Sequence, residues 1–143
     1  MAKIAVATGD GETVSPGHFA HAASFLVFEG GRVVEVRSNP LHTVPDPDDP
    51  AGASGMGGEM HHGLHGIAKY RLLREHVLGD VDVVICSGGC PTSITYFVSE
   101  GVRMVFTDPG YSVEDAVRLV TSVDPEDLPA ISVIEDGRLV TDY

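Results

Sequence analysis

"VDVVICSGGCPTSITYFVSEGVRMVFTD", residues 81–108, is the stretch that decides the fold expected of this chain. It opens with a near-continuous run of β-branched residues, which is typical of a strand buried in the centre of a sheet. A second apolar run fills residues 102–108. Between the two runs, Pro91 suits the first position of a helix, and Gly101 suits its end. The stretch therefore predicts two parallel strands joined by a helix.

Further elements are expected on the amino-terminal side of this unit. Residues 3–8 are typical of a short buried strand, and residues 24–38 of a hairpin that turns at Gly30 and Gly31. Residues 64–80 carry apolar side chains at helical spacing. The apolar positions of that helix are Ile67, Tyr70, Leu73 and Val77. The hairpin makes the second strand of the chain antiparallel to its neighbours.

On the carboxyl-terminal side, a helix over residues 112–123 is expected to begin at Ser112, which is followed by acidic residues. Residues 131–141 predict a hairpin built on Asp136 and Gly137. The length of 143 residues and the hydrophobic content of 43% fit one domain, residues 1–143. Strands and helices alternate, which predicts an α/β fold with a mostly parallel sheet covered on both faces. The expected sheet has five strands, and the terminal hairpin is an addition to it.

The segment between the first hairpin and the first helix is long. Residues 39–63 contain four prolines and a run of glycines, which exclude regular secondary structure. A loop of this length inside a compact domain is either functional or flexible. We therefore expect a long flexible loop over residues 39–63.

Composition excludes several classes of function. The formal net charge is −12, and no cluster of Lys or Arg is present to neutralise phosphates, so nucleic acid is not an expected partner. No segment approaches the roughly 18–20 consecutive apolar residues that span a bilayer. The first residues lack the basic region and the long apolar core of a secretory signal. A soluble, acidic, cytoplasmic protein is expected.

Residues with metal-binding chemistry gather at one predicted edge of the sheet. In open α/β sheets, ligands bind beyond the carboxyl ends of the parallel strands. Six of the seven histidines and both cysteines follow such ends in the sequence. Only His76, near the end of a helix, lies elsewhere, where it suits the negative end of the helix dipole. The pattern predicts a shared ligand site, although loops also collect polar residues for solubility.

Two cysteines, Cys86 and Cys90, lie four residues apart, which is not the Cys-x-x-Cys spacing of zinc or thioredoxin-type sites. Cys90 precedes Pro91 at a helix start, where backbone N–H groups favour a thiolate that ligates a metal or acts as a nucleophile. It is alternatively a small capping residue. Cys86 ends a central strand and, taken alone, suits a buried apolar position. Gly88 and Gly89 could let a ligand approach the backbone closely.

Three histidines, His61, His62 and His65, lie within "EMHHGLHG", residues 59–66. Imidazole suits zinc, copper, iron and nickel. The stretch lacks the glutamate of the His-Glu-x-x-His metalloprotease motif. Neighbouring glycines oppose a helix and favour a flexible flap. The cluster is either a set of ligands for a metal or a solvated loop.

The opening "KIAVATGDGETVSPGHFAHAASFLVFE", residues 3–29, resembles the dinitrogenase iron–molybdenum cofactor biosynthesis family. That family includes NifX-type carriers and the carboxy-terminal domain of the NifB type. His18 and Phe19 match its "His-Phe-Gly" motif, with Ala20 in place of the glycine. "GVRMVFTDPGYSVEDAV", residues 101–117, is similar to its last strand and helix, and the resemblance covers about residues 3–122. "CSGGCP" and the terminal hairpin depart from the family pattern.

The resemblance implies a ribonuclease H-like α/β/α fold with five strands in the order 3-2-1-4-5, the second of them antiparallel. It also implies non-enzymatic binding of an iron–sulfur or molybdenum-containing cluster, with His18 as a family position. The expected function is thus a carrier or scaffold for such a cluster, or for a metal ion, in cofactor biosynthesis. Its expected partners are proteins that donate or accept the cluster, and an oligomer is compatible with this role.

The expected site joins thiolates, imidazoles and two glycines. Its members are His18, Cys86, Cys90, Gly88 and Gly89, with His61, His62 and His65 as further metal ligands. Two other functions are compatible with the same residues. One is a thiol-dependent enzyme with Cys90 as nucleophile and His18 as base. The other is a regulatory module whose long loop recognises a partner.

Overall fold

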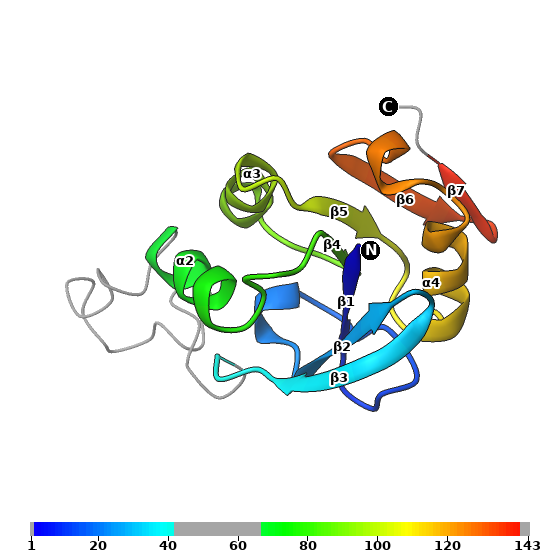
Figure 1. Ribbon diagram of the computed structural model, residues 1–143. Helices are drawn as coiled ribbons and strands as arrows, with labels where there is room; N and C mark the ends of the chain where they lie inside the picture. Colours follow the sequence, from blue (N-terminus) through cyan, green and yellow to red (C-terminus); the bar gives the residue numbers. More distant parts are fainter. Residues whose placement is uncertain (1, 42–66, 141–143) are drawn as a thin grey trace.

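The structure is a computed structural model that describes residues 2–41 and 67–140. Most of the predicted loop over residues 39–63, together with His61, His62 and His65, lies outside these residues. The described part is a mixed α/β structure (Figure 1). No helix in it is both long and apolar enough to cross a membrane.

The described strands form one sheet in the order β3-β2-β1-β4-β5-β6-β7. Strands β1, β4, β5 and β6 are parallel to one another, while β2 pairs with both β1 and β3 in the antiparallel sense, and β7 is antiparallel to β6. Their bounds are β1 Lys3–Thr8, β2 Ser24–Glu29, β3 Arg32–Ser38, β4 Val83–Cys86, β5 Arg103–Phe106, β6 Ile131–Glu135 and β7 Arg138–Val140.

The expected strand order 3-2-1-4-5 is therefore present, but the expected number of five strands is wrong. The terminal hairpin does not stand apart from the sheet. Strand β6 pairs in parallel with β5, with Met104 opposite Ile131 and Phe106 opposite Val133. This pairing satisfies the backbone groups along an edge of β5 that would otherwise be exposed, and it extends the sheet to seven strands.

Helices cover both faces of the sheet (Figure 1). Helices α2, Ile67–His76, and α3, Pro91–Ser99, pack on one face, where a core cluster includes Phe19, Tyr70 and Phe97. Helix α4, Val113–Thr121, packs on the other face against a second cluster. Two short 3-10 helices, η1, Phe19–His21, and η3, Pro125–Asp127, complete the described elements.

Local sequence signals account for most of the element boundaries. Gly30 and Gly31 have positive φ angles of 63° and 81°, as the tight turn between β2 and β3 requires. Helix α3 begins at Pro91, and α4 begins after Ser112, whose side chain accepts a hydrogen bond from the Asp115 N–H. Asp136 and Gly137 turn the last hairpin with φ angles of 51° and 73°. These predictions are confirmed.

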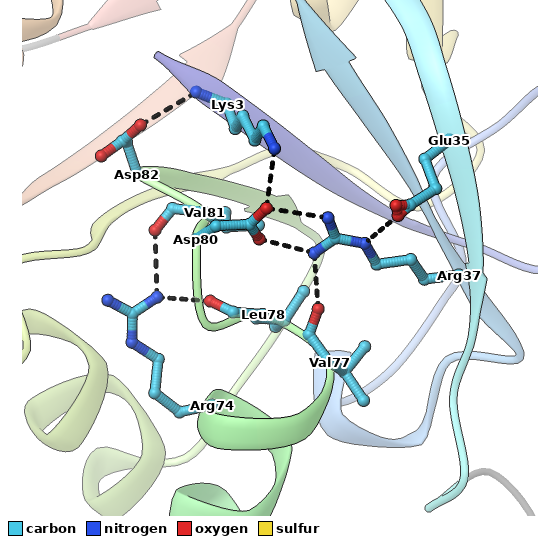
Figure 2. A network of polar contacts seen from close by, with 9 residues as sticks. All are labelled: Lys3, Glu35, Arg37, Arg74, Val77, Leu78, Asp80, Val81 and Asp82. Carbon is cyan, nitrogen blue, oxygen red and sulfur yellow. Dashed lines mark hydrogen bonds and ion pairs between the residues drawn. The ribbon is translucent and has the colours of Figure 1, made fainter.

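The carboxyl-terminal end of α2 is fixed by arginines (Figure 2). The Arg37 guanidinium donates to the Val77 carbonyl and to the Asp80 carboxylate, both at 2.7 Å. The Arg74 guanidinium donates to the Leu78 and Val81 carbonyls. These bonds satisfy carbonyl groups that the end of a helix leaves without partners. They hold α2 against β3 and against the turn that leads into β4.

Candidate functional site

His18 lies in the loop after β1 and caps η1. Its Nδ1 atom accepts a hydrogen bond of 3.1 Å from the backbone N–H of Ala20. A ring nitrogen that accepts from an amide carries no proton, so in the neutral ring the proton is on Nε2. The Nε2 atom lies 3.3 Å from the Tyr70 hydroxyl. In this state, His18 therefore presents an N–H group to Tyr70.

Cys90 caps the amino-terminal end of α3, as its position before Pro91 suggested. Its Sγ atom accepts from the Ser93 N–H at 3.4 Å, and its own N–H donates to Ser93 Oγ at 3.0 Å. Partial burial opposes ionisation, but hydrogen bonds from Ser93 and Tyr70 outweigh it and lower the pKa of the Cys90 thiol. A lowered pKa increases the thiolate fraction, which is the form that binds metal and attacks electrophiles.

Tyr70 of α2 joins these two residues. Its hydroxyl oxygen lies 3.1 Å from Cys90 Sγ and 3.3 Å from His18 Nε2. The rings of Tyr70 and His18 are nearly parallel, with an interplanar angle of 4° and centroids 5.6 Å apart. The loop after β1, helix α2 and the start of α3 thus bring an imidazole, a phenol and a thiol to one point.

The helical spacing predicts Tyr70 only as an apolar core residue. The contacts of its hydroxyl with His18 and Cys90 are missed by this prediction. The side chain is fully buried in the core cluster. A buried tyrosine hydroxyl needs a polar partner. The presence of a tyrosine among the aliphatic residues of the α2 stripe was therefore a signal for a polar contact.

Two further groups lie beside Tyr70. Lys69, 1% exposed, has its Nζ atom 3.4 Å from His21 Nε2. The same Nζ atom lies 5.0 Å from the centroid of the Tyr70 ring. The His21 and His18 rings meet edge to face, with centroids 5.7 Å apart. The site thus contains two imidazoles and one amine, and the amine adds positive potential within an acidic protein.

Cys86 occupies a different environment from Cys90. It is the last residue of β4, is fully buried, and belongs to the core cluster under α2 and α3. Burial raises the pKa of the Cys86 thiol to about 12. A thiol with such a pKa remains protonated at neutral pH. The observed burial therefore counts against the predicted role of Cys86 as a thiolate ligand.

Gly88 and Gly89 serve to pack one loop against another. The Gly88 carbonyl accepts a 3.0 Å hydrogen bond from the Phe19 N–H. A Cβ atom on Gly88 would lie 3.2 Å from the Gly17 carbonyl oxygen, and one on Gly89 would lie 3.3 Å from the Phe19 ring. The space that the missing side chains leave is filled by the chain itself, which counts against the predicted close approach of a ligand.

The other predicted site residues are placed as follows. His61, His62 and His65 lie outside the described residues. His76 ends α2, as expected of a histidine at the negative end of a helix dipole. Among residues 2–41 and 67–140, no group of three or more His, Cys, Asp or Glu side chains could hold a metal ion. The pair that the structure brings together is His18 and Cys90, through Tyr70.

The family model described as dinitrogenase iron–molybdenum cofactor matches residues 1–123. The chain belongs to this family. The matched region of the dinitrogenase iron–molybdenum cofactor family includes His18, Tyr70 and Cys90. The match stops before β6 and β7, so the strands that extend the sheet lie beyond the family region.

Two solved structures have folds similar to that of this chain. An NMR structure of a Thermotoga protein, described as a proposed NifB protein of the DUF35 family, is 21% identical with a TM-score of 0.56. It matches over 100% of this chain and 97% of that one. A crystal structure of a protein designated PH0822 is 19% identical with a TM-score of 0.50, over 99% and 96% of the two chains. Comparison with curated proteins finds no match.

Proposed function

We propose that this protein binds an iron–sulfur or molybdenum-containing cluster as cargo and carries it between proteins that donate and accept it. Membership of the dinitrogenase iron–molybdenum cofactor family supports a role in handling that cofactor. One observation carries the proposal for this chain. The Cys90 thiol and the His18 imidazole, from separate segments, both lie within 3.3 Å of the Tyr70 hydroxyl oxygen.

The chemistry of this pair fits a metal–sulfur cluster. Thiolates and imidazoles are common ligands of iron in proteins, and a thiolate is the usual ligand of iron–sulfur clusters. Cys90 and His18 are each partly exposed, so a cluster can approach them from solvent. The Lys69 amine lies beside the pair, and its positive potential favours an anionic cargo.

The proposed contact set is smaller than the set expected from the sequence. It contains His18 and Cys90. Cys86 is left out because its thiol is buried and its pKa is raised. Gly88 and Gly89 are left out because other residues of the chain fill the space next to their Cα atoms. The proposed role is that of a binding protein, and no catalytic step is assigned to it.

Anaerobic reconstitution with ferrous iron and sulfide tests the proposal. After desalting, iron and sulfide per chain and the visible absorption spectrum would be measured. Cys90→Ala is expected to reduce loading to background, because the thiolate is the strongest proposed ligand. Cys86→Ala is the matched control, since it removes the other thiol and is expected to load like the parent. His18→Ala is expected to load partly and to release the cluster faster.

Two results would contradict the proposal. One is a parent chain that retains no iron or sulfide. The other is loading that survives Cys90→Ala and disappears in Cys86→Ala, with both variants folded by circular dichroism. The second result would move the cluster to the core side of the sheet edge, away from His18.

A thiol-dependent enzyme is the alternative, and the lowered pKa of Cys90 favours it. The geometry favours it less, because the Tyr70 hydroxyl lies between Cys90 and its candidate base, His18. Iodoacetamide labelling followed by mass spectrometry separates the two functions. The enzyme requires rapid alkylation of Cys90 at neutral pH together with turnover of an electrophilic substrate. Rapid alkylation without any turnover supports the carrier.

A further inference from the structure

The three side chains at the candidate site have donor atoms of three kinds. Tyr70 Oη lies 3.1 Å from Cys90 Sγ and 3.3 Å from His18 Nε2. Each residue comes from a different segment: helix α2, the start of α3 and the loop after β1. The oxygen contacts both of the other donors, so the three donor atoms form one contiguous cluster.

These separations are close to those between the ligands of one metal ion. Metal–sulfur bonds are about 2.3 Å, and metal–nitrogen and metal–oxygen bonds are about 2.0–2.1 Å. Tetrahedral angles then place neighbouring donor atoms roughly 3.3–3.6 Å apart. The observed distances of 3.1 and 3.3 Å differ from this range by a few tenths of an ångström at most. The two separations that involve Tyr70 therefore already suit a phenolate that shares a metal with each of its neighbours.

We propose that Tyr70 is a third metal ligand, whose phenolate oxygen binds the same metal as Cys90 and His18. This inference rests on the proposed function, and it deepens it by naming the donor set: one thiolate, one imidazole and one phenolate. A transition metal that accepts soft and hard donors together, such as iron, suits this set.

Binding exchanges protons for the metal in a balanced way. The thiol proton of Cys90 and the phenol proton of Tyr70 leave to solvent as their bonds to the metal form. The His18 proton moves from Nε2 to Nδ1, which frees the Nε2 electron pair for the metal. That move breaks the hydrogen bond from the Ala20 N–H to Nδ1. Metal binding therefore removes the hydrogen bond by which His18 caps η1, and it is expected to loosen this short helix.

One contact favours a negatively charged oxygen on Tyr70. The Lys69 amine lies 5.0 Å from the centre of the Tyr70 ring and is 1% exposed. A cation in such a dry environment stabilises a nearby anion more strongly than it would in water.

Cobalt(II) alone, under anaerobic conditions, is a suitable probe of the donor set. A metal-bound tyrosinate gives an ultraviolet difference band, and a cobalt–thiolate bond gives a charge-transfer band. The parent is expected to show both bands with one cobalt per chain. Tyr70→Phe is expected to lose the tyrosinate band, keep the charge-transfer band, and bind cobalt at least about tenfold more weakly.

Matched variants assign the bands. Tyr111→Phe changes a partly buried tyrosine that packs on the opposite core cluster, and it is expected to leave both bands intact. Cys90→Ala is expected to remove the charge-transfer band. If Tyr70→Phe does not fold, a chain with phenylalanine at the other three tyrosines serves instead. That chain is expected to retain the tyrosinate band.

The outcomes separate this inference from the proposed function. A parent that binds no cobalt, or binds it without a tyrosinate band, overturns the role of Tyr70. A tyrosinate band that persists in Tyr70→Phe overturns it as well. A parent that loads a cluster but shows no tyrosinate band leaves the carrier function standing. A parent that shows both cobalt bands but takes up no iron and sulfide leaves the three-donor site standing without that function.

Discussion

The two ends of helix α2 are held by different chemistry. At the carboxyl-terminal end, the contacts are charged: Arg37 pairs with the Asp80 carboxylate, and Lys3 lies 2.7 Å from the same carboxylate (Figure 2). Toward the amino-terminal end, Tyr70 contacts a thiol and an imidazole. The charged end fixes the helix to β1 and β3. The other end presents the donor atoms that we propose as metal ligands.

The difference assigns stability to one end and chemistry to the other. Ion pairs between fixed side chains have no reason to change when a cargo binds. In the proposed site, the thiol and the phenol would release protons to solvent when a metal binds, and the imidazole would change its tautomer. A site of the second kind needs a rigid support, and the Arg37–Asp80 network with the core beneath α2 provides it. Substitutions at the centre and at each end of this arrangement test the division.

The largest effect is expected at the centre of the helix. Leu73 of α2 is fully buried, and Leu73→Ala leaves a cavity in the core beneath the middle of the helix. A loss of about 2–5 kcal/mol in the free energy of unfolding is expected, with reduced cluster loading. Urea denaturation measures the loss. Leu72→Ala is the control, because Leu72 is 39% exposed, and a comparable loss there would contradict the comparison.

A smaller effect is expected from a change that disturbs only the site. In Gly88→Ala, the new Cβ atom meets the Gly17 carbonyl oxygen at 3.2 Å, and backbone must move to accommodate it. A destabilisation of about 1–3 kcal/mol is expected. Cluster loading is expected to fall further than stability explains, because Phe19, next to His18, bonds to the Gly88 carbonyl.

The control for this change is Gly9→Ala, in the loop after β1 that also carries His18. A Cβ atom at Gly9 meets nothing within 4 Å, so stability and loading should match the parent. If Gly88→Ala loads a full cluster, the packing of the two loops is not what positions His18.

The smallest effect is expected at the charged end. Hydrogen bonds from Arg37 and then from Lys3 hold the pKa of the Asp80 carboxyl well below its usual range. Its contribution to stability is therefore complete above the unfolded pKa of about 3.9 and is lost as the pH falls below that value. Because the Asp80 side chain is 46% exposed, solvent screens it, and about 1 kcal/mol or less is expected.

Urea denaturation at pH 7 and pH 3 checks this sign. The parent is expected to lose more stability on acidification than Asp80→Asn does. Some acid sensitivity should remain in the variant, because backbone N–H groups of Thr13 and Glu12 lower the pKa of Asp10 to about 2. Cluster loading by Asp80→Asn at pH 7 should equal that of the parent. Impaired loading would show that the two ends of α2 are coupled.

Sequence patterns predicted the fold more completely than the site. The glycine pair at Gly30 and Gly31, the cap at Ser112 and the proline at Pro91 each act through local backbone geometry, so the chain alone reveals them. The addition of β6 to the sheet depends on pairing with β5, which is distant in sequence. Local patterns predict a hairpin there, but they carry no information about the strand beside it.

The site shows the same limit for side chains. Cys86 and Cys90 look equivalent in the sequence, yet one ends a strand inside the core and the other caps a helix in partial contact with solvent. Tyr70 looks like a core residue, and it is one, but its hydroxyl reaches two residues from other segments. Burial and contact are properties of the packed chain, and no spacing rule gives them.

By itself, the sequence determined the strands, the turns, the helix starts and the edge of the sheet to which His18 and Cys90 belong. These follow from backbone geometry and from the alternation of apolar and polar residues over a few positions. The tertiary structure decided which thiol is accessible, that the last hairpin joins the sheet, and that a phenol stands between the thiol and the imidazole. Those outcomes depend on which distant segments pack together, because pKa, exposure and donor distance are set by neighbours in space.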